Sequence, residues 1–180
     1  MKNPWKTKSS KKIYQNEWIS FIIDQVVRPD GKRGIYSYVS KLPGVVIIPL
    51  TKNNELYFVG QWRYPIKKYS WELPMGTLEK GEQPLQTAKR EFLEEANLTA
   101  KKWHKIGSAY FANGSLDQIA YLYLARGLSS KRGQPDGCEK LTIKKFNLTQ
   151  IEKMIKTGKI HDAMTIVAFY KLLLYFKNPK

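Results

Sequence analysis

The chain has 180 residues, of which 42% are hydrophobic and 13% are aromatic, enough for one folded domain with a small extension. Its formal net charge of +16 favours anionic partners such as nucleotides, nucleic acid or acidic membrane surfaces. The single cysteine, Cys138, excludes an intramolecular disulfide. No apolar h-region follows the basic N-terminus, and the most apolar run, residues 166–176, is too short to span a bilayer, so we expect a cytoplasmic protein.

Residues 1–42 are expected to form a small N-terminal antiparallel β extension. Residues 1–12 are polar and basic, and we expect them to fray. Apolar and aromatic residues over 13–27 and 34–39 predict two strands, and the Pro, Asp and Gly between them predict a turn. Because an isolated hairpin is only marginally stable, this one needs a surface that covers it.

Both strands and helices are predicted in the remainder of the chain, residues 43–178, so the expected fold class is α/β. Short apolar runs between turn residues predict strands at 45–50, 55–60, 103–111, 118–125 and 141–146. Apolar residues at helical spacing predict helices at 84–96, 149–157 and 162–176. Pro84 suits the first turn of its helix, and Asn97 tolerates the left-handed conformation that ends one.

Carboxylates are concentrated around the first of these helices. Six of the 15 acidic residues fall within 72–98, although the chain as a whole is strongly basic. Glu91, Glu94 and Glu95 are spaced i, i+3 and i+4, so they share one helix face. A bound divalent cation would neutralise this face, and the alternative is a solvated acidic surface with Arg90 as a partial counter-ion.

The spacing of these residues resembles the Nudix hydrolase box, G-x5-E-x7-R-E-U-x-E-E-x-G-U, in which U is a bulky apolar residue. Gly76, Glu82 and the run that begins at Arg90 match it, and Asn97 replaces the last glycine. The resemblance implies a Nudix-type α/β/α sandwich with a mixed central sheet for residues 43–178.

Two further segments resemble the ADP-ribose pyrophosphatase subfamily of Nudix hydrolases. Residues 61–65, Gln-Trp-Arg-Tyr-Pro, are similar to a subfamily signature, and residues 72–76 are similar to its Glu-apolar-Pro-Ala-Gly motif. Residues 111–113 lack the proline that is common at the corresponding place in the subfamily. The resemblance implies hydrolysis of the diphosphate of ADP-ribose or related nucleoside diphosphate sugars, and a homodimer formed through the N-terminal extension.

The resemblance also implies a set of metal ligands. The Glu91 and Glu95 carboxylates would bind the metal directly, and Glu94 would bind it directly or bridge. The main-chain carbonyl of Met75 would be an additional ligand. Mg²⁺ is the expected cation, with Mn²⁺ as an alternative.

The general base is assigned by resemblance as well. Glu94 is one candidate, and a carboxylate in the loop before the last strand is another, for which we favour Glu139 over Asp136. Glu82 and Arg90 would hold the acidic helix and loop in place, or they would form an ordinary ion pair.

Four residues are expected to bind substrate. Arg63 suits a phosphate clamp because its guanidinium meets phosphate in a bidentate manner, and the alternative is a surface ion pair. Trp18 and Tyr36 correspond to the aromatic residues that stack on adenine in related enzymes, unless they pack in a core. Glu72 opens the second subfamily motif and is also expected at the substrate.

The sequence leaves alternatives to the hydrolysis of a nucleoside diphosphate sugar. Within the superfamily, the substrate could instead be a dinucleoside polyphosphate or an RNA 5′ end. A non-catalytic nucleotide-binding Nudix module is disfavoured because a binding module has no need of every carboxylate in the E-x-x-E-E set. A basic nucleic-acid-binding protein would alternate aromatic and basic residues along one surface, and because the sequence has no such motif we do not expect nucleic acid as a partner. A membrane is not expected either, because no apolar run is long enough to span one.

Overall fold

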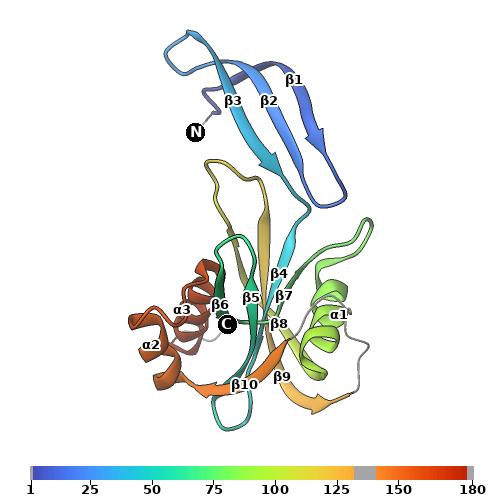
Figure 1. Cartoon of the computed structure of the whole chain (residues 1–180), viewed down its shortest axis with the longest axis vertical. Coiled ribbons are helices and arrows are strands. Elements are labelled where there is room, and N and C mark those ends of the chain that lie inside the picture. The colour runs from blue at the N-terminus through green and yellow to red at the C-terminus, as the bar shows by residue number, and fades with distance from the viewer. Residues whose placement is uncertain (1, 132–140, 178–180) are drawn as a thin grey trace. The chain divides into compact units, whose positions relative to one another are not determined.

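The computed structural model describes residues 2–131 and 141–177, which form two compact units. The first unit contains residues 1–42 and 110–119, and the second contains residues 43–109 and 120–180. Strands dominate the first unit, whereas the second combines strands with three helices in its described residues (Figure 1). No helix in the described residues combines the length and the apolar character needed to cross a membrane.

The first unit is built on an antiparallel sheet of order β1-β2-β3. Its strands are β1 (Lys6–Gln15), β2 (Ser20–Val27) and β3 (Arg33–Ser40). The expectation that residues 1–12 fray is therefore wrong from Lys6 onward. All ten residues of β1 are exposed, so no alternation of buried and exposed residues marks the strand. Its lysines are typical of a sheet edge that is protected from pairing with another chain.

The single strand expected over 13–27 is also wrong, because a turn at Asn16 divides it. The Asn16 side-chain oxygen accepts hydrogen bonds from the backbone N–H groups of Trp18 and Ile19, at 2.9 and 2.8 Å. An asparagine that bonds the backbone two and three residues ahead competes with extended structure. The predicted turn between the next two strands is confirmed, with Gly31 at φ +80°.

The second unit contains two sheets. A three-stranded sheet has the order β10-β5-β6, and a four-stranded sheet has the order β7-β4-β9-β8. β4 is parallel to β9 and antiparallel to β7, so the larger sheet is mixed as expected. The strands are β4 (Gly44–Pro49), β5 (Glu55–Arg63), β6 (Lys68–Glu72), β7 (Met75–Thr77), β8 (Leu98–Tyr110), β9 (Ile119–Ser130) and β10 (Thr142–Asn147).

Helices cover the strands of the second unit on both sides. Figure 1 shows α1 on one side of these strands and α2 and α3 on the other. The helices are α1 (Pro84–Ala96), α2 (Leu148–Lys156) and α3 (Ala163–Lys177). Every residue of β4 is buried, and Phe92 of α1 packs in the same apolar cluster as Val45 and Ile47 of that strand. The expected α/β sandwich is confirmed.

The helix α1 begins and ends where the sequence predicted. Pro84 lies in its first turn, and the side-chain oxygen of Gln86 accepts a hydrogen bond from the N–H of Gln83 at 3.0 Å. Asn97 takes the left-handed conformation, with φ 53° and ψ 37°. The capped helix gives its carboxylates a fixed orientation along one face.

Candidate active site

Glu91 of α1 lies directly against Gly76 of β7. A Cβ atom added to Gly76 would lie 2.0 Å from the Cδ and Oε1 atoms of Glu91, so only glycine leaves room for this carboxylate. The Glu91 side chain is 15% exposed. Burial raises the pKa of Glu91 to about 7, even though the neighbouring Arg90 acts in the opposite direction. The effect of burial therefore exceeds that of the neighbouring Arg90 charge.

Glu95, one helical turn further on, contacts the residue before that glycine. Its carboxylate accepts a hydrogen bond from the backbone N–H of Met75 at 3.0 Å. β7 is in turn paired with β4 through Met75 and Gly76. Two carboxylates of α1 thus lie against one short strand, Glu95 at Met75 and Glu91 at Gly76, and the role of these residues as metal ligands stays a prediction.

Arg90 is the centre of an ion-pair network on the same helix. Its guanidinium nitrogens lie 3.1 Å from Glu82, 3.0 Å from Glu91 and 3.0 Å from Glu94. It also donates to the carbonyl oxygen of Thr77 at 3.4 Å. The hydrogen bonds from Arg90 lower the pKa of Glu82 to about 2. Arg90 therefore ties the loop before α1 to the carboxylate face of the helix.

The carboxylates of α1 are candidate ligands for a divalent cation. Among the residues that the structure describes, no three acidic, histidine or cysteine side chains already converge as a metal site, and Glu91 and Glu94 both contact Arg90. The donors are nonetheless carboxylate oxygens, the ligand type that hard divalent ions prefer. The raised pKa of Glu91 indicates a place where an additional cation would be stabilising. The chemistry of the donor set fits a divalent ion.

A second polar arrangement lies on the β5–β6 hairpin. The Arg63 Nε donates to both oxygens of Glu72, at 3.0 and 3.2 Å. The side chain of Glu72 is 4% exposed and that of Arg63 is 35% exposed. The buried carboxylate of Glu72 therefore holds the guanidinium of the partly exposed Arg63 in place. Sequence reasoning missed this pairing because β6, which carries Glu72, was not predicted.

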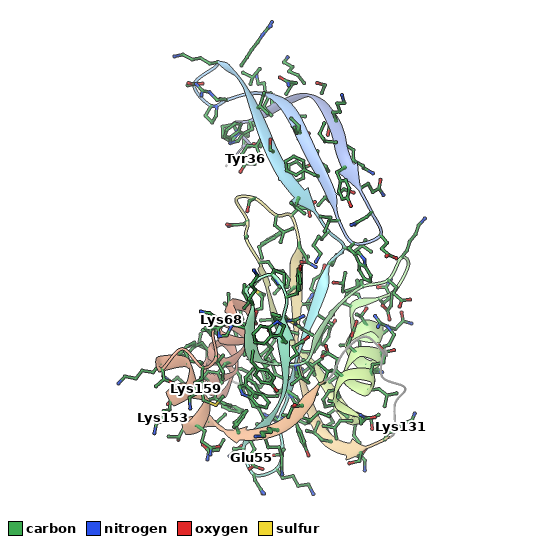
Figure 2. The ribbon with its side chains drawn as sticks, viewed as in Figure 1. Tyr36, Glu55, Lys68, Lys131, Lys153 and Lys159 are labelled. Carbon is green, nitrogen blue, oxygen red and sulfur yellow. The ribbon has the colours of Figure 1, made fainter. Side chains whose placement is uncertain are left out.

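Trp18 and Tyr36 lie in the first unit. Trp18 is 70% exposed. Tyr36 on β3 (Figure 2) donates its hydroxyl hydrogen to the carbonyl of Gly114 at 2.8 Å, and its ring meets Trp5 edge-on at 5.4 Å. Trp5 was missed as a neighbour of Tyr36 because the segment before β1 carries no periodic signal.

The remaining candidates for the general base are Glu94 and two carboxylates of the loop before β10. Glu139 and Asp136, the two candidates for a loop carboxylate, lie outside the described residues. Glu94 is 33% exposed and contacts Arg90. The described candidate residues are therefore the α1 carboxylates, which lie against the β7 backbone, and the Arg63–Glu72 pair on the β5–β6 hairpin.

Comparisons with known proteins match both parts of the chain. The NUDIX domain family matches residues 40–166, and the family called nucleoside diphosphate sugar hydrolase N-terminal domain matches residues 5–39. An ADP-ribose pyrophosphatase of Bacillus subtilis (strain 168) is 32% identical over 171 residues, which are 94% of this chain and 92% of that protein. A methanol dehydrogenase activator of Bacillus methanolicus is also 32% identical over 171 residues, with the same coverage of 94% and 92%.

A solved structure described as an ADP compounds hydrolase superposes on this chain with a TM-score of 0.85. The alignment covers 96% of this chain and 94% of that one, at 16% identity. At that identity, the likeness establishes a shared fold.

Proposed function

This chain belongs to the Nudix hydrolase family, and from that premise we propose that it is a Mg²⁺-dependent pyrophosphatase that acts on ADP-ribose or a related nucleoside diphosphate sugar. Hydrolysis of the diphosphate gives a nucleoside monophosphate and a sugar phosphate. The observation that carries the proposal is the carboxylate face of α1, held against β7 at Met75 and Gly76.

Nudix hydrolases generally use divalent metal ions. In this chain, Glu91, Glu94 and Glu95 would hold the ion, with the Met75 carbonyl as a further ligand. When bound, such an ion neutralises diphosphate oxygens and lowers the pKa of a bound water. Mg²⁺ is the proposed ion because all of these donors are oxygen atoms, and Mn²⁺ shares that preference.

The residues around the carboxylates have separate tasks. Arg90 and Glu82 fix the loop that precedes α1, so that Gly76 and Met75 stay against the helix. Arg63 binds the diphosphate, and Glu72 orients its guanidinium, because a buried bidentate pair restricts the rotation of a long side chain. The proton from the attacking water passes to Glu94 or to Glu139.

The first unit supplies the base-binding and dimerisation functions in this proposal. Trp18 and Tyr36 would stack on the nucleoside base, a contact worth about 1–3 kcal/mol where it has been measured in nucleic-acid binders. The exposed apolar side chains of the sheet, among them Ile13, Tyr14 and Ile35, would be covered in a homodimer. Light scattering at micromolar concentration would then give about twice the chain mass of 20.9 kDa, and a monomer mass would refute the dimer.

A hydrolysis panel tests the proposed activity. Purified protein is incubated with nucleoside diphosphate sugars, a dinucleoside polyphosphate and capped RNA, with Mg²⁺ or with EDTA. We expect Mg²⁺-dependent release of AMP from ADP-ribose at a kcat/KM well above that for the other two classes. Preference for the dinucleoside polyphosphate or for capped RNA would refute the proposed substrate class. Equal rates of hydrolysis in Mg²⁺ and in EDTA would refute the requirement for a metal ion.

A further inference from the structure

A cavity of about 460 Å³ opens beside the turn that follows β4. It falls within the range of roughly 300–1,000 Å³ that is common for small-molecule sites. Its walls come from the β4–β5 turn, from β5, from β9 and from β10. Its lining includes Lys52, Glu55, Tyr57, Arg126, Leu128 and Lys145.

The cavity is separate from the candidate active site. No lining residue belongs to the carboxylate face of α1 or to the Arg63–Glu72 pair. β7 pairs with β4 as far as Val46, whereas the cavity begins at Leu50, four residues further along the chain. At about 3.3 Å per residue, that spacing places the two sites roughly 13 Å apart along β4.

The walls of the cavity are positively charged. Three cations, Lys52, Arg126 and Lys145, and one acid, Glu55, line the cavity, and Glu55 lies 3.6 Å from Lys145. Lys52 and Arg126 form no ion pair with any residue in 2–131 or 141–177. A guanidinium and an ammonium that pair with no acid of the described residues, beside one cavity, favour an anionic ligand, and the arginine fork suits phosphate.

The cavity also has an ordered turn and an apolar wall. The backbone N–H of Thr51 donates to the Glu55 carbonyl at 2.9 Å, and the Thr51 hydroxyl oxygen accepts from the Glu55 N–H at 3.1 Å. These bonds fix the turn that carries Lys52. Tyr57 and Leu128 provide apolar surface, and Lys145 Nζ lies 5.8 Å from the centre of the Tyr57 ring. The cavity thus offers cations for a phosphate and a flat wall for a ring.

We propose that this cavity is a second ligand site, distinct from the active site, that binds a nucleoside 5′-monophosphate. Arg126 and Lys52 bind the phosphate, and the base lies against Tyr57. The combination of ring and phosphate distinguishes this ligand from an inorganic anion, which would leave the Tyr57–Leu128 wall unused. The site does not depend on the catalytic activity proposed above.

Nuclear magnetic resonance titration of the full chain with AMP tests the site directly. The amide signals of Asn53 and Gly127, which line the cavity, report binding there and not at the carboxylates of α1. We expect both signals to shift saturably with AMP, and to shift far less with adenosine or with inorganic phosphate at the same concentrations.

Charge reversal within the cavity provides the second arm. Lys52→Glu with Arg126→Glu should weaken AMP binding at these two signals by at least about tenfold, since hydrogen bonds to charged groups are among the stronger ones. Lys153→Glu with Lys159→Glu is the matched control, because both lysines are exposed, lie away from the cavity lining and carry the same total charge (Figure 2). The control should bind AMP like the unmodified protein.

Several results would overturn the proposal. Absence of shifts at Asn53 and Gly127 up to about 10 mM AMP, roughly ten times a dissociation constant of 1 mM, would exclude the site. Equal weakening in both double variants would show only an effect of overall charge. Equal shifts with inorganic phosphate would show an adventitious ion only. If the double variant does not fold, Lys52→Ala and Arg126→Ala are titrated singly, and unchanged AMP affinity in both would refute the assignment.

Discussion

Glu91→Gln should stabilise the metal-free protein at pH 8 while it weakens metal binding. Glu91 has a folded-state pKa of about 7, raised from 4.5 mainly by burial against Gly76. A carboxyl group with a raised pKa contributes stability that is complete below pH 4.5. That contribution is lost as the pH rises through about 7, because ionisation is easier in the unfolded chain.

The size of the effect follows from the two pKa values. A difference of this size corresponds to about 3 kcal/mol as an upper bound, and relaxation around the ionised group reduces it to about 2 kcal/mol. For a chain of this length, such a change raises the melting temperature by about 4–8 °C. Glutamine keeps the shape of the side chain beside Gly76, so packing should be preserved.

Thermal unfolding in EDTA at pH 5 and pH 8 checks this expectation. Glu91→Gln should melt above the unmodified protein at pH 8, with a smaller difference at pH 5. Added Mg²⁺ should raise the melting temperature of the unmodified protein more than that of the variant, because metal binding stabilises the ionised carboxylate. A variant that is less stable than the unmodified protein at pH 8 in EDTA would refute the reasoning about burial.

Three other substitutions test the surrounding contacts. Glu82→Gln should lower the free energy of unfolding by about 2 kcal/mol at pH 7 and by almost nothing near pH 2. The depressed pKa of the Glu82 carboxyl group contributes stability above pH 4.5, and this contribution is lost as the pH falls through about 2. Urea unfolding at both pH values measures the difference. Gly76→Ala should displace Glu91 and reduce kcat at least about a hundredfold, as misplaced catalytic groups do, and steady-state kinetics with near-native rates would contradict the close contact. Glu72→Gln should raise KM for ADP-ribose and lower kcat because Arg63 loses its anchor, whereas unchanged kinetics would show that the pair is only structural.

The parts of the fold that local signals specify were predicted well. The bounds of α1 follow from Pro84, the apolar spacing and Asn97, all of which act within a few residues. β4 was predicted from an unbroken apolar run, which is typical of a strand buried on both faces. That Glu91, Glu94 and Glu95 share one helix face follows from their spacing, whereas their assignment as metal ligands came from the resemblance to the Nudix box and stays a prediction.

The parts that depend on distant pairing were not predicted. β1 is a polar edge strand whose hydrogen bonds to β2 create it, so no apolar period marks it in the sequence. β7 has three residues, one of them glycine, and forms through its pairing with β4. The Arg63–Glu72 contact depends on the register of the β5–β6 hairpin. The cavity beside Lys52 joins four segments and has no signature in any of them.

The most direct test of the central claim is the Mg²⁺ dependence of ADP-ribose hydrolysis in the unmodified protein and in Glu95→Gln. Glu95 accepts a hydrogen bond from the Met75 N–H, which the amide oxygen of glutamine can still accept, so the contact between α1 and β7 should survive. Lys153→Gln serves as the control because it removes an exposed charge on α2. The account predicts that Glu95→Gln folds, that it requires far more Mg²⁺, and that its turnover falls steeply at limiting Mg²⁺. Near-native turnover by Glu95→Gln at limiting Mg²⁺ would contradict the assignment of the α1 carboxylates as the metal site.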